Sequence, residues 1–190
     1  MATRAALVRA ARELFAARGY AAVGTTEIVE RAGVTRGAMY HHFNDKRELF
    51  RAVYEELEAD SAQQVGEAVA REPQVERHLE VGLDAFLDAC LDPAHRRISL
   101  LEAPSVLGYE EWRGIGAEFS LGLLRAALEA AMNIGRIERQ PVDPLAHLLL
   151  GALAEAALML ARAEDPQRAR REVGETVLRL VAGLAPPLTR

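Results

Sequence analysis

The sequence has little of what several common protein classes require. Cys90 is its single cysteine, so the 190-residue chain can form no internal disulfide and offers no cysteine cluster for a metal. Strand-forming residues are sparse and never alternate cleanly with polar ones, which argues against a β-sheet protein. No stretch of about eighteen or more apolar residues lacks a polar break. The N-terminal segment is amphipathic rather than a signal peptide. These absences predict a soluble, cytoplasmic, all-helical protein that does not enter a membrane.

Lysine is also scarce, and the charge is unevenly distributed. Lys46 is the only lysine, and every other basic side chain is an arginine. Residues 1–51 carry nine Arg or Lys and five Asp or Glu, a net of +4, although the whole chain has a net charge of −5. A basic N-terminal segment on an otherwise acidic chain would orient the protein towards a polyanion, although a random distribution of charges could produce the same pattern.

Residues 25–46 predict two short helices joined by a tight turn. Thr25 or Thr26 is expected to cap the first helix. Gly33 is expected to end it, because glycine accepts the left-handed conformation that a C-cap requires. Thr35 is then expected to cap the second helix.

The second helix, expected over residues 36–43, has two different faces. Met39 and Phe43 lie four residues apart and are expected to face inward. The outer face carries a cation, hydrogen-bonding rings and small residues: Arg36, Gly37, Ala38, Tyr40, His41 and His42. A short helix of this kind can enter a DNA major groove. A helical hairpin that only builds core would explain the apolar positions but not the exposed rings.

The same segment carries a family resemblance. The matching positions are Leu14, Phe15, Gly19, Tyr20, Thr25, Thr26, Ile28, Ala32, Gly33, Val34, the run 39–43, Asp45 and Lys46. In type and spacing they resemble the helix-turn-helix of the TetR (tetracycline-repressor) family of bacterial transcription regulators. The resemblance implies an all-α fold in which residues 1–47 form a three-helix DNA-binding domain. A long connector helix would join it to a helical ligand-binding and dimerisation bundle over residues 48–190.

The resemblance also implies a DNA-binding surface. A homodimer would bind a double-stranded DNA operator through Thr25, Thr26, Thr35, Arg36, Gly37, Ala38, Tyr40, His41, His42 and Lys46. Arg36 is the expected base reader, because a guanidinium matches the O6/N7 edge of guanine. Gly37 and Ala38 would allow close approach, and the other side chains would mainly contact phosphates.

Further helix starts can be read from the sequence. Asp45, with a glutamate three residues on, predicts the start of the connector helix, which should run to about Ala70. Asp92, Asp143 and Asp165 each precede a proline, a pair typical of a helix cap and first turn.

The last two helices predict the dimer interface. Residues 145–161 are apolar almost all round, and an apolar stripe marks residues 168–184. The resemblance implies that these helices pair with their copies in a second subunit, although a purely internal pair of core helices is the alternative. The expected interface comprises Leu148, Gly151, Ala152, Glu155, Val173, Val177, Leu180, Val181 and Leu184.

The family pattern further implies a pocket for a small, largely apolar effector. Its candidate lining is Phe86, Cys90, His95, Tyr109, Trp112, Phe119, His147, Glu155 and Met159. Glu155 is the only charge in its apolar helix, and a buried carboxylate must be paired or protonated. It is expected either to pair with an arginine at the dimer interface or to meet a polar or cationic group of the ligand.

Catalysis is not expected. His95 and His147 lack the spacing of metal ligands, and no glycine-rich phosphate loop or nucleophile elbow is present, so no metal, cofactor or enzymatic activity is predicted. Two hypotheses remain. One is a dimeric, ligand-responsive DNA-binding repressor; the other is a helical dimer that binds a small molecule or protein without binding DNA.

Overall fold

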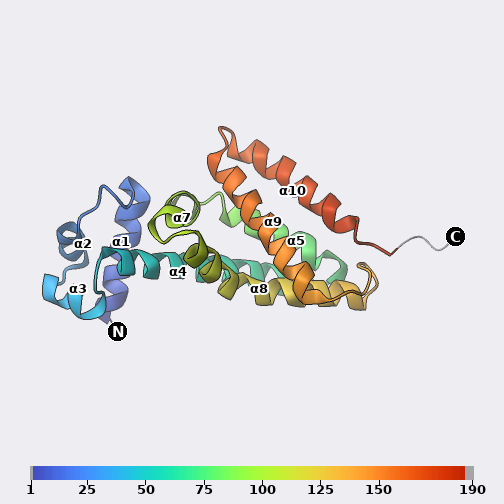
Figure 1. The fold of residues 1–190 in the computed structure, drawn as a ribbon, viewed down its shortest axis with the longest axis horizontal. Helices are drawn as coiled ribbons and strands as arrows, with labels where there is room; N and C mark the ends of the chain where they lie inside the picture. The colour runs from blue at the N-terminus through green and yellow to red at the C-terminus, as the bar shows by residue number, and fades with distance from the viewer. Residues whose placement is uncertain (1, 187–190) are drawn as a thin grey trace. The chain divides into compact units, whose positions relative to one another are not determined.

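The computed structural model describes residues 2–186, and every regular element within them is helical (Figure 1). The α-helices and the π-helix η2 have these bounds: α1 Ala2–Arg18, α2 Thr25–Ala32, α3 Arg36–His42, α4 Lys46–Arg71, α5 His78–Ala89, α6 Pro93–His95, η2 Arg96–Glu102, α7 Ala103–Val106, α8 Tyr109–Asn133, α9 Val142–Arg162 and α10 Pro166–Ala182. A short 3-10 turn, η1, covers Val75–Arg77. The structure confirms the all-α fold class.

The chain packs into two compact units. The N-terminal unit comprises residues 1–59 and 92–115, and the C-terminal unit comprises residues 60–91 and 116–190. Residues 92–115 therefore pack with the first sixty residues, although more than thirty positions separate them in sequence. This division is based on packing. The predicted boundary between a DNA-binding domain ending at residue 47 and a ligand-binding domain beginning at residue 48 is a functional one, and it stays a prediction.

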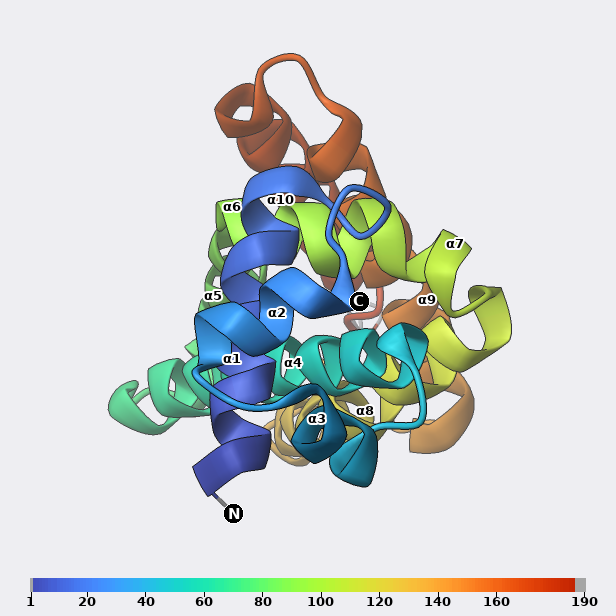
Figure 2. The ribbon, with the colours of Figure 1, turned by 90° about the vertical axis from the view of Figure 1, so that its left-hand side faces the viewer.

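Aromatic side chains form the centre of the N-terminal unit. The ring centroid of Phe15 lies 5.7 Å from that of Tyr20 and 5.4 Å from that of Phe50, and the rings of Tyr20 and Phe50 meet edge to face at 5.1 Å. Phe15 and Phe50 are fully buried, and each contributes on the order of 2 kcal/mol by leaving water. α1 contacts α2, α3, α6 and η2, so it is the helix around which this unit is built (Figure 2).

The predicted helix caps are partly confirmed. Asp92 accepts a hydrogen bond from His95 N at 2.8 Å, and Asp165 accepts one from Arg168 N at 3.0 Å. The prediction for Asp143 is wrong, because α9 already begins at Val142. The Asp143 carboxylate instead forms an ion pair with Arg125 Nε at 2.7 Å.

Residues 96–102 form a π-helix rather than part of an ordinary α-helix. Hydrophobic periodicity does not distinguish a π-helix from an α-helix over seven residues, so the wider turn could not be predicted from the sequence. π-Helices, with i→i+5 hydrogen bonds, are rare, and they frequently occur at functional sites. Pro104 lies in the first turn of α7, where a proline has no required N–H to lose.

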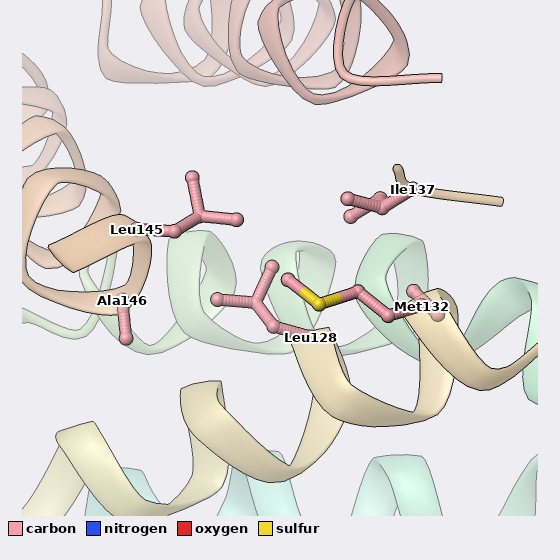
Figure 3. Packing of buried hydrophobic residues seen from close by; sticks show 6 residues of the cluster. Leu128, Met132, Ile137, Leu145 and Ala146 are labelled. Carbon is pink, nitrogen blue, oxygen red and sulfur yellow. The ribbon is translucent and has the colours of Figure 1, made fainter. Parts of the chain in front are cut away.

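The C-terminal unit has its own apolar core. Figure 3 shows Leu128 and Met132 of α8 facing Ile137 and Leu145, with Ala146 beside them. α9 and α10 pack side by side, and α10 also contacts α5 (Figure 1). Arg170 of α10 forms ion pairs with Asp84 at 3.0 Å and Asp88 at 2.8 Å, both on α5.

α9 is apolar on its inner and outer faces. Ala146, Ala157 and Leu160 are buried, whereas Leu148 is 74% exposed and Met159 is 54% exposed. Within residues 2–186 it is also the one helix long and apolar enough to cross a membrane by length and composition. A core helix of a soluble protein meets the same criterion, so this observation alone assigns no membrane.

Candidate functional site

The first helix of the helix-turn-helix, α2, begins and ends at glycines. Gly24 occupies the N-cap, and no side chain caps the helix there, so the prediction that Thr25 or Thr26 is the cap is wrong. Gly33 ends the helix with φ of 67°, as predicted. Its N–H and that of Val34 donate to carbonyls of the last turn of α2. The turn that aims α3 is therefore fixed by backbone hydrogen bonds.

α3 is held by a side-chain cap and two buried anchors. Thr35 Oγ1 accepts a hydrogen bond from Ala38 N at 3.2 Å, which confirms the predicted N-cap. Met39 is fully buried and Phe43 is 2% exposed, as the sequence predicts. The Arg4 guanidinium stacks over the Phe43 ring at 5.3 Å, a contact that the sequence does not indicate.

Arg36 and Tyr40 form the exposed centre of α3. The Arg36 guanidinium carbon lies 5.5 Å from the centroid of the Tyr40 ring. Hydrogen bonding from Arg36, and then from Thr25, holds the pKa of the Tyr40 hydroxyl below its ordinary value. Tyr40 is 43% exposed, so the pair, which carries the positive charge of Arg36, faces water and is accessible to a phosphate or a base edge.

The remaining candidates for DNA contact surround this pair. Exposed positions are Thr26, Thr35, Gly37 and His41, and half-buried positions are Thr25, Ala38, His42 and Lys46. The rings of His41 and His42 lie 5.2 Å apart in an edge-to-face arrangement. The ten predicted DNA-contacting residues lie on α2, at the N-cap of α3, on α3 and at the start of α4.

Lys46 has a structural role that the sequence does not indicate. Its Nζ donates to the carbonyls of Tyr20 at 2.9 Å and Val23 at 3.0 Å, and it lies 4.0 Å from the centroid of the Tyr20 ring. An ammonium group has three N–H donors, so one remains for another acceptor. The predicted phosphate contact stays a prediction, and Lys46 also fixes the turn between α1 and α2.

The nine effector candidates do not form one buried group within a unit. Cys90, His95 and Trp112 are buried, Phe86 and Phe119 are half-buried, and Tyr109, His147, Glu155 and Met159 are exposed. His95, Tyr109 and Trp112 belong to the N-terminal unit, and the others belong to the C-terminal unit. The premise that Glu155 is buried is wrong for the single subunit, because its side chain lies on the exposed face of α9.

A buried polar cluster in the N-terminal unit was missed by sequence reasoning. His95 Nε2 lies 4.0 Å from Glu58 Oε1, and the two side chains are only 6% and 13% exposed. The Ser99 hydroxyl is near enough to lower the pKa of Glu58, yet it makes no hydrogen bond of ordinary geometry. Burial dominates both titrations: it raises the pKa of Glu58 to about 7 and lowers the pKa of His95 to about 4.

The same unit contains long-range contacts to residues 92–115. Arg47 donates to the carbonyls of Val106 at 3.2 Å and Leu107 at 2.9 Å, and it also pairs with Glu111. Trp112 Nε1 donates to the Ser99 carbonyl at 2.9 Å. Nothing in local spacing links Arg47 to residues more than fifty positions away, so no sequence signal could have identified its partners.

The predicted dimer residues are mixed in exposure. Leu148, Ala152, Glu155 and Leu180 are exposed; Gly151, Val173, Val181 and Leu184 are half-buried; and Val177 is 8% exposed. Val177 therefore belongs to the packing of its own subunit. The exposed apolar members lie on α9 (Leu148 and Ala152) and on α10 (Leu180), and Glu155 is the exposed charged member on α9.

The fold and the outward-facing α3 define a helix-turn-helix DNA-binding regulator. The model for bacterial regulatory proteins of the tetR family matches residues 7–53, and the model for tetracyclin repressor-like C-terminal domains matches residues 76–184. Because the second match covers more than half of the chain, this protein belongs to the TetR family and is a transcriptional regulator.

Individual relatives agree with this assignment. The chain is 28% identical over 159 residues to the transposon Tn10 TetC protein of Escherichia coli, a match that covers 82% of this chain and 79% of TetC. It is 38% identical over 104 residues to the probable HTH-type transcriptional regulator ArpR of Pseudomonas putida, which covers 51% and 47%. A crystal structure of a TetR-family transcriptional regulator from Pectobacterium atrosepticum superposes with a TM-score of 0.85 at 30% identity, covering 96% and 94%.

Proposed function

We propose that this regulator is a cytoplasmic, ligand-responsive repressor that binds a palindromic operator as a homodimer. The observation that carries the proposal is the exposed Arg36–Tyr40 pair, mounted on a helix whose other face is anchored by buried Met39 and Phe43. An anchored helix with an exposed guanidinium can enter the major groove without rearranging its own core. Two such helices in a symmetric dimer would meet successive grooves of a palindrome.

The division of labour on the DNA follows from side-chain chemistry. Arg36 would read a guanine, and Gly37 and Ala38 would let the backbone approach the base edges. Phosphate contacts would come from the surrounding hydroxyls, rings and cation: Thr25, Thr26, Thr35, Tyr40, His41, His42 and Lys46. These contacts would set affinity and register, whereas Arg36 would set sequence preference.

The second copy would cover the outer surface of α9 and α10. Leu148 is 74% exposed and Leu180 is 59% exposed, and exposed apolar side chains at these positions favour burial against a like surface. Glu155, exposed in the subunit, would then lie at or near the interface. A small, largely apolar effector would release DNA by binding better to the conformation that does not fit the operator, with a coupling of roughly 1–3 kcal/mol.

A mobility-shift assay with the DNA upstream of the protein's own gene, followed by footprinting, tests the proposal. We expect a protected palindrome and an affinity that falls as salt rises, because phosphate contacts release counterions. If the folded dimer shifts no DNA at low salt, the operator-binding function is wrong. The protein would then be a helical dimer that binds a small molecule or protein.

A further inference from the structure

The turn between α1 and α2 is held by two side chains of opposite charge. Tyr20 N donates to Glu102 Oε2 at 2.8 Å. The Tyr20 carbonyl accepts from Lys46 Nζ at 2.9 Å. One peptide unit on each side of Tyr20 is therefore fixed by a charged partner, and charge-assisted hydrogen bonds are stronger than neutral ones. This turn leads directly into α2, the first helix of the helix-turn-helix.

Glu102 fits the turn because residue 19 is a glycine. Gly19 has φ of 85°, a conformation that other residues rarely adopt. A Cβ at this position would lie 2.4 Å from Glu102 Oε1, a distance at which the carboxylate would have to move. Gly19 is therefore required twice, once for the backbone conformation and once for the approach of Glu102.

Arg97 provides a second attachment from the same π-helix. Its Nη1 donates to the carbonyl of Ala17 at 2.8 Å, near the end of α1. Carbonyls in the last turn of a helix lack intrahelical partners, so an arginine there satisfies an otherwise open acceptor. Arg97 and Glu102 thus bind the chain on either side of Gly19, one at a carbonyl and the other at an N–H.

The opposite side of η2 is anchored in the interior of the unit. Ile98 and Ser99 are fully buried, and the Ser99 carbonyl accepts from Trp112 Nε1. A π-helix has a wider turn than an α-helix. If η2 tightened to α-helical geometry, the angular spacing between residues 97 and 102 would change, and Arg97 and Glu102 could no longer both reach their present partners.

We propose that Glu102 is a positioning residue for operator binding. Its carboxylate, held by the π-helix, binds the α1–α2 turn through Tyr20 N. The geometry of η2 therefore sets the position of the chain where it enters the helix-turn-helix. The operator-binding form requires η2 in its wide turn with Glu102 on Tyr20 N. This inference rests on the proposed operator binding. It means that residues 96–102 position the DNA-binding helices through direct hydrogen bonds.

Substitutions at Glu102 test the proposal. Glu102→Gln keeps an oxygen acceptor of the same length, so operator affinity should stay within about threefold of the parent chain. Glu102→Ala removes the acceptor and should weaken operator binding by roughly tenfold or more, the effect expected for a hydrogen bond to a charged group. Glu110→Ala, which removes an exposed carboxylate from α8, is the matched control and should bind as the parent does. Affinity is measured by fluorescence anisotropy with the footprinted duplex, below the thermal midpoint of every variant.

Two further measurements separate positioning from general stability. Amide hydrogen exchange at Tyr20 should accelerate in Glu102→Ala but not in Glu102→Gln, whereas exchange in the core of α9 should be unchanged. Arg97→Ala should weaken operator binding by about threefold, since the Ala17 carbonyl loses its guanidinium donor at an exposed site, where water can replace it. This variant keeps the proposal testable if Glu102→Ala does not fold.

The outcomes are distinct. If Arg36→Ala weakens binding but Glu102→Ala and Arg97→Ala both bind as the parent does, the positioning role is wrong and the proposed function stands. Equal losses in Glu102→Gln and Glu102→Ala would also overturn it, because the acceptor would then be irrelevant. If the parent chain binds no DNA, the proposed function fails, and the positioning role fails with it.

Discussion

The outer faces of α3 and α9 are both exposed in the subunit, but their chemistry differs. α3 presents Arg36 and Tyr40, which are polar and can remain in water at little cost. α9 presents Leu148 and Met159, whose apolar surface would gain roughly 25 cal/mol for each Å² removed from water. The difference matches the two surfaces proposed above: a polar one for the operator and an apolar one for the second copy of the chain.

The two surfaces also differ in how their affinity should respond to conditions. Binding at α3 should weaken strongly with salt, since it replaces counterions on phosphates. Association through the apolar surface of α9 and α10 should be almost independent of salt, because the hydrophobic contribution does not depend on ion screening. Measurements on variants of each surface can therefore be assigned by their salt dependence.

The largest effect is expected from a charge on the apolar surface. Leu180→Glu would bury two like carboxylates across a two-fold interface, at a cost on the order of 3–5 kcal/mol. We expect monomers by light scattering and a matching loss of operator binding. Gln167→Glu adds the same charge to an exposed site on α10 and should remain dimeric. A dimeric Leu180→Glu would place the interface elsewhere.

The second effect concerns the buried Glu58–His95 pair, which belongs to neither surface. Burial raises the pKa of Glu58 to about 7 from an ordinary 4.5, so its contribution to the free energy of unfolding is lost as pH rises between those values. Burial lowers the pKa of His95 to about 4 from 6.5, so its contribution is lost as pH falls through that range. The nearby Asp92 and Arg12 modify the His95 titration in opposite directions.

The two pH ranges overlap, and the two groups change the free energy of unfolding in opposite directions. Their contributions should therefore nearly cancel in the parent chain between about pH 4.5 and 6.5. In Glu58→Gln only His95 titrates, so the free energy of unfolding should fall by about 3 kcal/mol on acidification from pH 6.5 to pH 4. In His95→Gln only Glu58 titrates, so the free energy of unfolding should fall by a similar amount as the pH rises from 4.5 to 7. Urea denaturation across this pH range measures both. Parallel pH profiles in the two variants would contradict the assignment.

The polar surface of α3 could be predicted from sequence because one contiguous segment encodes it. Gly33, Thr35, Met39 and Phe43 each act on neighbours within a few positions, and the structure confirms all four roles. Contacts between distant segments could not be predicted in the same way. No periodicity or capping rule relates Glu102 to Tyr20, which lie eighty-two positions apart.

The sequence errors have a related cause. Asp143 matches the pattern of a helix cap, but α9 begins one residue before it, and its carboxylate pairs with Arg125 of α8. Glu155 was expected to be buried because its helix is apolar all round, yet one face of that helix is left exposed by the subunit. Periodicity indicates that a helix will be covered, but it does not indicate whether its own chain or a second copy covers it.

A third effect sharpens the account of α3. Arg36→Ala should cost on the order of 1–3 kcal/mol of operator binding and relax the preference at one base position. Arg31→Ala is the control, because Arg31 is an exposed arginine of α2 that pairs with Glu13 at 2.7 Å. Competition binding with single-base variants of the operator measures the preference. If Arg36→Ala weakened binding to every sequence equally, Arg36 would contact a phosphate rather than a base.

The smallest effect compares the same kind of helix cap in the two regions. Thr35 accepts a hydrogen bond from Ala38 N at the start of α3, and Asp165 accepts one from Arg168 N at the start of α10. Replacing either by alanine should lower the free energy of unfolding by about 1 kcal/mol, since a helix N–H loses its partner. Only Thr35→Ala should also weaken operator binding, because Thr35 caps the end of α3 that carries Arg36 and is itself a proposed phosphate contact. Thermal melts and anisotropy on both variants decide the matter: equal losses of operator affinity would show that the cap acts through stability alone and that the geometry of α3 does not depend on it.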